Sequence, residues 1–511
     1  MMTAVMALLA MPTFAARFDA YFANWAQYHS DQYKHTPADL ANIAGRTDTI
    51  MYSFLYFCPP SGTTPMPYWA VAPFGSCTDD TEYQLITVES KDEAFIESMM
   101  SYQSNTTKIV ASIGGWNFPS YYFSQMVASA ESRSKFIASA KATLSKFKFS
   151  GIDIDWEFPC SPPRSAEVEI TCSKFRTVSD LGGKCPDDSN NFATFLAELR
   201  EGLGDEMIIT VASQAGLTNA KNQGINAETS KLVDAWHIMT YDYTVPDTAT
   251  GATISPNAPL YTPKSPGTTQ MSIADTVQGY VALLHVPPEK IVIGIPFYGH
   301  GWFDPTMNAP SKGFGQNGTI QGKCCGVFKQ TYGSKPGYAS KQCGLMMYSE
   351  ILAALGGGDD SSSIIFDNAT KSDIVYFKDA GADGGYTEAG TFVSYAGPKS
   401  IDAIVAYSEK QRLGGVFIFD TSMDTVTKSG TWTFDLMNQI ADSMNKPRPT
   451  PGPAPGPAGT PTCASAGQVA LCQDACTSKC RGFQPAFQPG CVADTDCSDP
   501  PSWANGSVCS C

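Results

Sequence analysis

The chain of 511 residues is 43% hydrophobic and 16% charged, which predicts a globular protein with a core larger than that of one average domain. Its formal charge of −15 and the lack of a basic run argue against DNA or RNA as a partner. After the first residues, no stretch contains the roughly 18 uninterrupted apolar residues that a membrane span requires, so we expect no such span.

The chain opens with MMTAVMALLAMPTFAA, residues 1–16, a short apolar stretch that ends in small residues. This pattern is typical of a secretory signal peptide, although the basic residues that usually precede the apolar stretch are missing. A misplaced start of the gene or a buried first segment would give the same pattern. We expect residues 1–16 to be a signal peptide and the protein to be secreted, either extracellular or attached to a cell wall.

From residue 18 onward, strand patterns alternate with helical patterns. Eight strands separated mostly by helices predict an α/β fold, and a (β/α)8 TIM barrel rather than an open sheet. The long interval of about 301–411 before the eighth strand exceeds one helix and predicts an inserted subdomain. The expected strands are Phe18–Trp25, Thr49–Phe57, Lys108–Gly115, Ser150–Phe158, Met207–Ala215, Asp234–Tyr243, Lys290–Gly299 and Gly414–Asp420.

The fourth strand contains a row of acids, in the stretch SGIDIDWEFP of residues 150–159. Alternation places Asp153, Asp155 and Glu157 on one face and the apolar residues between them on the other. In an isolated antiparallel strand, such a row would be a solvated polar face. Between two helices we expect a parallel strand with a covered outer face, where inward acids are costly unless they have a function.

Carboxyl groups this close together cannot all ionise cheaply, so we expect them to share protons and one member to have a raised pKa. Such a member can act as a general acid at mild pH. Glu157 is the last of the row and the nearest to the mouth of the barrel, so it is best placed to donate a proton to a leaving group. Asp155 is then either a nucleophile or an orienting group.

The sixteen cysteines fall into two even sets, eight before residue 344 and eight from Cys463 onward. Between them lies a Pro-rich linker, residues 446–462, of the kind that spaces two domains. We expect disulfides rather than zinc sites, because the paired spacing and histidine partners of a zinc site are missing. Four glycosylation motifs agree with export, although such triplets also arise by chance. They begin at Asn105, Asn317, Asn368 and Asn505.

The tail, residues 463–511, is too short to build a sufficient core without disulfides. If the body of the chain hydrolyses a sugar polymer, as the family resemblance described next implies, such a module on a Pro-rich linker is expected to bind carbohydrate, with Phe483, Phe487 and Trp503 as platforms for sugar rings. The same aromatic residues would also serve as the few core residues of a very small fold.

Six short motifs resemble glycoside hydrolase family 18, the chitinases. SGIDIDWE from Ser150 is similar to the catalytic signature DGxDxDWE of the family, and SIGGW from Ser112 to its signature SxGGW. The resemblance covers roughly residues 17–444 and implies a catalytic domain over residues 17–445 with an inserted α+β subdomain. The other matching motifs are YFANWAQY from Tyr21, MTYDY from Met239, GIPFYG from Gly294 and SYAGPKSI from Ser394.

The resemblance implies a secreted chitinase that hydrolyses β-1,4 bonds between N-acetylglucosamine units of chitin. In the retaining, substrate-assisted mechanism of the family, the acetamide of the substrate attacks the sugar. Glu157 would act as acid and then base, while Asp155 would orient the acetamide and exchange a proton with Asp153. Tyr241 would donate to the acetamide oxygen. The residues implied to line the sugar site are Tyr21, Phe54, Gly115, Trp116, Met239, Asp242, Tyr298, His300 and Phe419.

Two positions depart from the family pattern. His300 replaces an arginine that often contacts substrate, and it is as readily interpreted as a satisfied pocket histidine. Phe419 ends the eighth strand where a tryptophan is usual, and its smaller ring without an N–H donor predicts a weaker central subsite.

Three other functions remain to be distinguished. A non-catalytic chitin-binding lectin would have the same barrel without the acid, and Glu157 is present. An endo-β-N-acetylglucosaminidase acting on glycans would share the mechanism. A metal-dependent hydrolase would use the acids as ligands, but the five histidines show no paired ligand spacing, so we expect neither a metal nor a cofactor. We expect a monomer that binds chitin or N-acetylglucosamine oligosaccharides.

Overall fold

The computed structural model of the protein describes most of one compact unit, Met1–Arg448, and a second unit covers Pro449–Cys511. The predicted signal peptide apart from Ala16, the linker after Lys446 and the cysteine-rich tail therefore lie outside the described residues. The structure describes residues 16–29, 31–60, 77–160, 167–171, 174–178, 187–245, 253–265, 267–303, 314–316, 318, 345–356, 364–382, 387 and 389–446.

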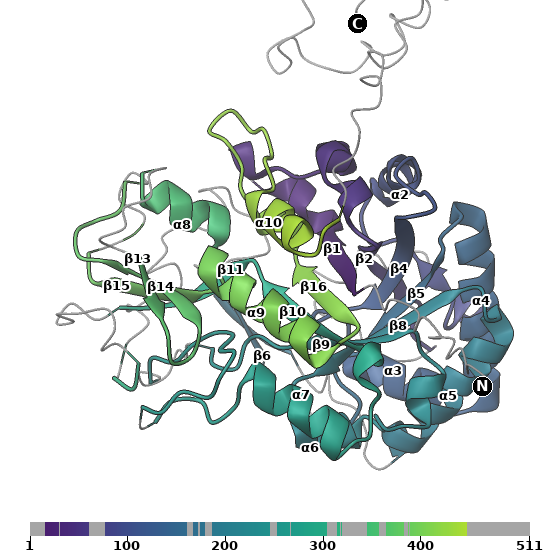
Figure 1. The fold of residues 1–511 in the computed structure, drawn as a ribbon. Coiled ribbons are helices and arrows are strands. Elements are labelled where there is room, and N and C mark those ends of the chain that lie inside the picture. The colour runs from purple at the N-terminus through teal and green to yellow at the C-terminus, as the bar shows by residue number, and fades with distance from the viewer. Residues whose placement is uncertain are drawn as a thin grey trace, which may run out of the picture. The chain divides into compact units, whose positions relative to one another are not determined.

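Eight parallel strands form a closed barrel, which confirms the predicted (β/α)8 architecture (Figure 1). Each barrel strand hydrogen-bonds to the next, and β1 also pairs with β2, so that the sheet has no free edge in this ring. A short additional strand, β3 (Leu85–Ile86), pairs antiparallel with β2. In their order around the barrel the strands are β1 (Arg17–Ala23), β16 (Gly415–Phe419), β10 (Ile291–Pro296), β9 (Ala235–Met239), β8 (Ile208–Gln214), β5 (Gly151–Asp155), β4 (Lys108–Gly114) and β2 (Thr49–Phe57).

Helices cover the outside of the barrel because each has one apolar stripe. In α4 (Ala130–Phe147) the buried residues include Phe136, Ala140 and Leu144, whose spacing is the helical pattern of the sequence. The side chain of Ser129 accepts a hydrogen bond from the backbone N–H of Ser132 and so caps the start of this helix. The other covering helices are α2 (Asp92–Met100), α3 (Ser120–Val127), α5 (Asp187–Leu203), α6 (Leu217–Asn222), α7 (Ile273–Ala282), α9 (Pro398–Gln411) and α10 (Asp435–Ser443).

Short 3-10 helices join several of these elements. They are η1 (Asn24–Tyr28), η2 (Asp31–Tyr33), η3 (Pro37–Asn42), η4 (Ala44–Arg46), η5 (Asp79–Thr81), η6 (Thr229–Lys231), η7 (Pro288–Lys290) and η9 (Thr421–Met423).

Alternation along the strands separates two apolar regions. Outward residues such as Ile152, Ile154 and Trp156 of the acidic strand pack in the main core between the barrel and its helices. Inward residues form a smaller cluster inside the barrel: Tyr21, Met51, Val110, Ala235, Val292 and Phe417. The interior of the barrel is thus filled by side chains and is not a channel.

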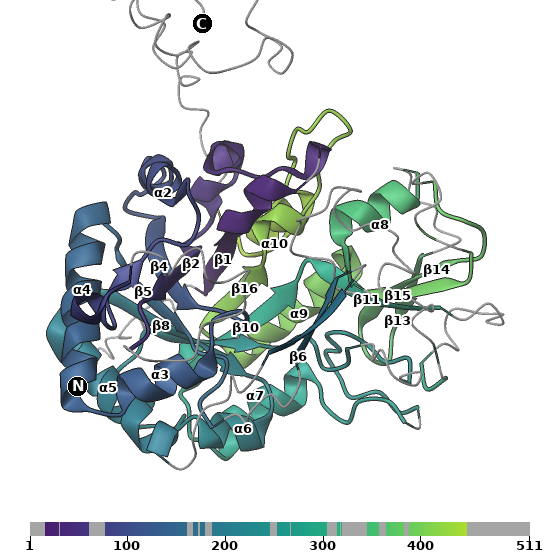
Figure 2. The same cartoon turned by 180° about the vertical axis from the view of Figure 1, so that it is seen from behind.

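A second sheet of five antiparallel strands, formed by residues that follow β10 and precede α9 in the sequence, lies at one side of the barrel (Figures 1 and 2). It has its own small core, which includes Trp302, Ile374 and Phe392. Helix α8 (Tyr348–Ala354) belongs to this segment, and α9 then packs against both β14 and β16. In sheet order the strands are β12 (Leu345–Met347), β11 (Tyr298–Phe303), β15 (Thr391–Tyr395), β14 (Ser372–Phe377) and β13 (Ile364–Asp367).

A third sheet consists of one hairpin, β6 (Glu167–Thr171) and β7 (Lys174–Val178).

A disulfide joins Cys58 to Cys77, and Cys160 is also disulfide-bonded, in agreement with the predicted use of the cysteines. Among the helices of the described residues, none is long and apolar enough to cross a membrane.

Candidate active site

The acidic row lies where β5 reaches the carboxyl-terminal mouth of the barrel. Asp153 and Asp155 are buried inward residues of β5, whereas Glu157 lies two residues beyond the end of the strand and is partly exposed. Their apolar neighbours face outward, and the indole N–H of Trp156 donates to the Ser120 hydroxyl at 2.7 Å. The row thus runs from the barrel interior to its mouth.

Hydrogen bonds from three strands hold Asp153 at the inner end of the row. The hydroxyls of Tyr21 and Ser112 donate to its Oδ2 at 2.9 and 2.7 Å. The Thr210 hydroxyl donates to Oδ1 at 2.6 Å, and Nδ1 of His237 lies 3.6 Å from the same oxygen. Burial alone would raise the pKa of Asp153, but these partners outweigh it and lower the pKa. Asp153 therefore remains ionised.

Asp155, the middle member, has the opposite environment. Burial raises its pKa well above the usual value, and the charges of Glu157 and Asp153 raise it further. Its Oδ1 is buried and has no hydrogen-bond partner in the part of the chain that the structure describes. Asp155 therefore retains a proton more readily than Asp153 does.

Two glycines of the SIGGW motif let the chain pass close to this row. Gly114 has a φ of +111°, and a Cβ there would lie 2.2 Å from the backbone oxygen of Asp155. Gly115 has a φ of +87°, and a Cβ there would lie 2.5 Å from a ring atom of Phe54. Its N–H donates to the Asp155 carbonyl at 2.8 Å, so the motif fixes β4 against the end of β5.

The MTYDY motif follows β9 on another side of the mouth. Burial raises the pKa of Tyr241 well above the usual value, and Asp155 and Asp242 raise it further, so its hydroxyl remains a proton donor. Oδ1 of Asp242 accepts a hydrogen bond from the Tyr298 hydroxyl at 2.8 Å and lies 2.7 Å from Nε2 of His300. Both partners come from β11, so this group links the barrel to the second sheet.

His300 is almost completely buried, and its Nδ1 has no hydrogen-bond partner among the described residues. Asp242 in contrast is 44% exposed. His300 is thus a buried partner of Asp242, whereas the Asp242 side chain is accessible from outside.

Aromatic rings line the mouth next to the acids. Trp25 of η1 stacks on Phe54 with ring centroids 5.7 Å apart and an angle of 15°, and it approaches Phe419 at 6.5 Å. Phe419 also lies 5.8 Å from the ring of Tyr21. A surface of adjacent rings is suited to the faces of sugar rings. Of the remaining predicted residues, Met239 packs against the inner cluster, and Trp116 stands 48% exposed after β4.

Sequence reasoning missed several residues of the site. Trp25 was part of a matching motif but was not predicted to line the site. Thr210 of β8 donates a hydrogen bond to Asp153, and His237 of β9 lies next to the same carboxylate. Alternation along these strands would have indicated that both point inward, but only the register across the barrel shows that they meet Asp153.

Among the described residues, no group of three or more His, Cys, Asp or Glu side chains could hold a metal ion. Asp153 instead accepts hydrogen bonds from three hydroxyl groups and lies 3.6 Å from Nδ1 of His237. The arrangement of the acids of β5 is suited to proton transfer.

Carboxyl groups of unequal proton affinity at the mouth of a (β/α)8 barrel, next to aromatic rings, define the site of a glycoside hydrolase. The chain belongs to glycosyl hydrolases family 18, whose profile matches residues 17–424. The family predicted from the short motifs is thereby confirmed.

Named relatives are similar over the barrel. "Chitinase A1" of Niallia circulans is 29% identical over 330 residues, which cover 62% of this chain and 40% of that protein. "Probable chitinase 2" of Drosophila melanogaster is 27% identical, with 62% and 56% covered. "Chitotriosidase-1" of Mus musculus is 26% identical, with 60% and 59% covered. The chain thus spans about half the length of these relatives.

Solved structures share the fold. The Ostrinia furnacalis Group IV chitinase in complex with allosamidin has a TM-score of 0.62 at 22% identity, and the match covers 84% of this chain and 99% of that one. Human YKL-39, described as a pseudo-chitinase with retained chitooligosaccharide binding, has a TM-score of 0.60 at 20% identity, with 84% and 100% covered. These matches show the fold, and the function has to be argued from the site residues.

Proposed function

We propose that the protein is a secreted chitinase that hydrolyses β-1,4 bonds between N-acetylglucosamine units. The observation that carries this proposal is the graded acidic row, in which Asp153 is held ionised, Asp155 retains a proton and Glu157 lies at the open end. Family membership and the names of the relatives support the same substrate.

In the proposed mechanism the substrate supplies the nucleophile. Glu157 donates its proton to the glycosidic oxygen as the bond to the anomeric carbon breaks. The acetamide oxygen of the same sugar attacks that carbon from the other side and forms an oxazolinium ion. Asp155 orients the acetamide N–H and balances the developing positive charge, and Tyr241 donates a hydrogen bond to the acetamide oxygen.

Water completes the reaction. The Glu157 carboxylate accepts a proton from a water molecule, which attacks the anomeric carbon and opens the oxazolinium ring. Two inversions at one carbon give a product of retained β configuration. Asp153 supports the cycle because its fixed negative charge lets Asp155 exchange a proton during the reaction.

The aromatic surface of Trp25, Phe54 and Phe419 provides the platform on which the sugar rings stack. Asp242, Trp116 and Tyr298 are proposed to contact further parts of the substrate. Gly115 lets the backbone pass close to the ring of Phe54. The cysteine-rich tail is proposed to bind chitin, and the whole protein to act as an extracellular monomer.

The test is a mass analysis of the products from colloidal chitin and, in parallel, from a high-mannose glycoprotein. We expect chitin oligosaccharides from the first substrate and an intact glycan on the second. Release of the glycan alone would instead identify an endo-β-N-acetylglucosaminidase. Binding of chitin oligosaccharides without any product would identify a lectin.

The mechanism has a separate test. Proton NMR of a fresh digest of N-acetylglucosamine hexamer should show the β anomer first. An initial α anomer, or rapid cleavage of cellohexaose, which lacks the acetamide, would contradict the substrate-assisted route.

A further inference from the structure

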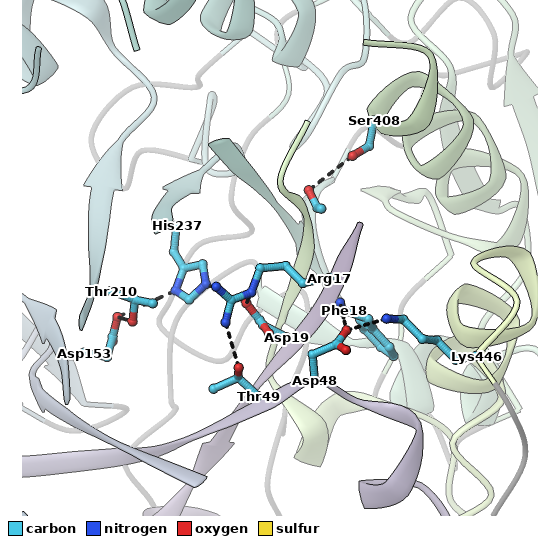
Figure 3. A network of polar contacts seen from close by, with 11 residues as sticks. Arg17, Phe18, Asp19, Asp48, Thr49, Asp153, Thr210, His237, Ser408 and Lys446 are labelled. Carbon is cyan, nitrogen blue, oxygen red and sulfur yellow. Dashed lines mark hydrogen bonds and ion pairs between the residues drawn. The ribbon is translucent and has the colours of Figure 1, made fainter. Parts of the chain in front are cut away.

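Below the acidic row, a chain of buried charged groups continues toward the amino-terminal ends of the strands (Figure 3). Asp19 and His237 are both fully buried, and Nε2 of His237 lies 2.9 Å from Oδ2 of Asp19. Nε of Arg17 is 2.6 Å from the same oxygen, and its Nη2 donates to the Thr49 hydroxyl at 2.8 Å. The other ring nitrogen of His237 faces Asp153 at 3.6 Å. The acidic row is thus connected to the bottom of the barrel by His237, Asp19 and Arg17.

The two carboxylates that face His237 favour a second proton on its ring, although Nδ1 is too far from Asp153 for a hydrogen bond. A neutral imidazole has one N–H and one lone pair, whereas each nitrogen here faces a carboxylate. The contact to Asp19 is short enough to require a proton on Nε2. A neutral ring would then direct a lone pair at Asp153. A doubly protonated ring instead presents an N–H to both carboxylates.

We propose that Asp19 is a positioning residue that keeps His237 doubly protonated and directed at Asp153, so that Asp153 stays ionised and the proton shared by the two aspartates of the row resides on Asp155. This inference rests on the proposed function, because it concerns the same carboxyl groups. It adds a residue that no motif of the site contains and that lies too deep to contact a substrate.

The pKa shifts agree with this geometry. Burial alone would lower the pKa of His237, but Asp153 and Asp19 outweigh it and raise the pKa. Burial alone would raise the pKa of Asp19, but Arg17 and His237 outweigh it and lower the pKa. The two carboxylates and the imidazolium therefore stabilise one another.

The charges that face His237 are few within the described part of the barrel. Tyr21 of β1 is the other titratable group next to the ring, with centroids 6.1 Å apart, and its pKa is raised well above the usual value by burial and then by Asp153. Phe417 of β16 packs on the ring at 5.0 Å. The register partners of His237, Ala212 of β8 and Val292 of β10, have no titratable side chain. Asp19 and Asp153 are therefore the groups that set its charge.

The test is the pH dependence of kcat/KM in Asp19→Asn, measured on a chitin oligosaccharide. Without the Asp19 charge, His237 loses its proton at lower pH, and Asp153 then loses its cationic neighbour and accepts a proton more readily. The acidic limb of the profile should therefore move to higher pH by about one unit, the scale of one nearby charge. The basic limb, which reports Glu157, should stay in place.

The double variant shows whether Asp19 acts through His237. His237→Gln should move the acidic limb in the same direction, and Asp19→Asn should add nothing further in that background. An equal additional shift in the double variant would overturn the proposal. Asp92→Asn is the matched control, because Asp92 is a fully buried carboxylate bonded to Tyr52 and Asn24 outside this chain of charges. It should leave the acidic limb unchanged even where it lowers stability.

A measurement that needs neither activity nor a folded Asp19→Asn variant completes the test. In ¹⁵N NMR of the wild-type protein, His237, assigned by its absence from His237→Gln, should show two protonated ring nitrogens through neutral pH. Titration near the ordinary histidine pKa would overturn the proposal even if Asp19→Asn fails to fold. If the wild-type protein cleaves no chitin oligosaccharide, the proposed function fails, whereas the NMR result still decides the charge of His237.

Discussion

Three carboxyl groups of one short segment have three different environments, and these differences divide the chemical tasks among them. Asp153 accepts hydrogen bonds from three hydroxyls and faces a histidine, whereas burial and negative neighbours act on Asp155. Glu157 lies beyond the strand, where it is partly exposed. A fixed charge at the inner end, a shared proton in the middle and an exchangeable proton at the mouth are a workable set for acid–base catalysis.

Replacing Glu157 with Gln should abolish hydrolysis and leave oligosaccharide binding largely intact. The amide keeps the shape of the side chain but has no proton to transfer, and general acid catalysis contributes about 10² to 10⁴-fold in rate. Turnover of the hexamer and calorimetric binding would be measured on the same preparation. Glu198→Gln is the control, since Glu198 pairs with Arg133 on the outer helices and should keep full turnover. Near-normal turnover of Glu157→Gln would assign the acid elsewhere.

Gly115 tests how closely the chain must pass beneath the aromatic surface. Gly115→Ala adds a Cβ 2.5 Å from a Phe54 ring atom, so it should displace the Phe54–Trp25 stack and raise KM for oligosaccharides. Gly204→Ala is the matched control, because Gly204 has a similar φ of +85° but open space around its Cβ. In the control, the free energy of unfolding should fall by only about 1–2 kcal/mol, which is the cost of placing alanine in a left-handed backbone conformation. Equal KM values for the two variants would contradict a role of the stack in binding.

At the scale of elements, the eight barrel strands follow from periodicity in the sequence, because the apolar outer faces and the helices between them leave a distinct pattern. The acidic row was predictable for the same reason, since alternation alone places Asp153 and Asp155 on one face. The position of His237 next to Asp153 could not be predicted, because it depends on the register of β9 relative to β5 across the barrel. The short strands of the second sheet pair antiparallel over long separations, and no local pattern specifies such pairs.

Asp424 illustrates how a loop after the last strand fixes a helix. Its carboxyl oxygens accept hydrogen bonds from the backbone N–H groups of Leu436 and Met437 at the start of α10, at 3.1 and 2.9 Å. Asp424→Ala would leave these buried donors unpaired. We expect a loss of about 1–3 kcal/mol in the free energy of unfolding, measured by denaturant titration.

This loss should depend on pH. Burial raises the pKa of Asp424 to about 6, so the native carboxyl holds its proton more tightly than the unfolded chain does. The resulting stabilisation is fully present below the unfolded pKa and is lost as the pH rises through about 6. The effect of Asp424→Ala should therefore be larger at pH 4 than at pH 7. Asp435→Ala, an exposed carboxylate in the first turn of the same helix, should cost less at both values.

At the scale of the whole molecule, the contacts of the first unit, Met1–Arg448, continue beyond its last helix, α10. Nζ of Lys446 pairs with Asp48 at 2.6 Å, and the Lys446 carbonyl accepts a hydrogen bond from Arg46 at 3.2 Å. Asp48 in turn accepts a hydrogen bond from the backbone N–H of Phe18, at the start of β1 (Figure 3). Lys446 is therefore part of the barrel, and a truncation must leave it in place.

Truncation after Arg448 should lower activity on crystalline chitin several-fold and leave hydrolysis of soluble oligomers unchanged. A binding module on a linker raises the concentration of the catalytic unit at an insoluble surface without altering its active site. A shorter variant that ends at Asn445 is the control for stability, because it also lacks the Lys446 ion pair. Equal activity of the full chain and the Arg448 truncation on the insoluble polymer would leave the tail with a task other than chitin binding.

The pairing of β1 with both β2 and β16 also bears on how the protein is made. A chain that emerges from its amino terminus presents β1 first, yet one edge of this strand has no partner until β16, near the end of the unit, has followed. Pairing between distant segments is slow, because the loop must close before any contact forms. Phe419, at the end of β16, joins Tyr21 and Tyr241 only when the ring is complete. We therefore expect nascent chains to be inactive until almost the whole unit has been synthesised.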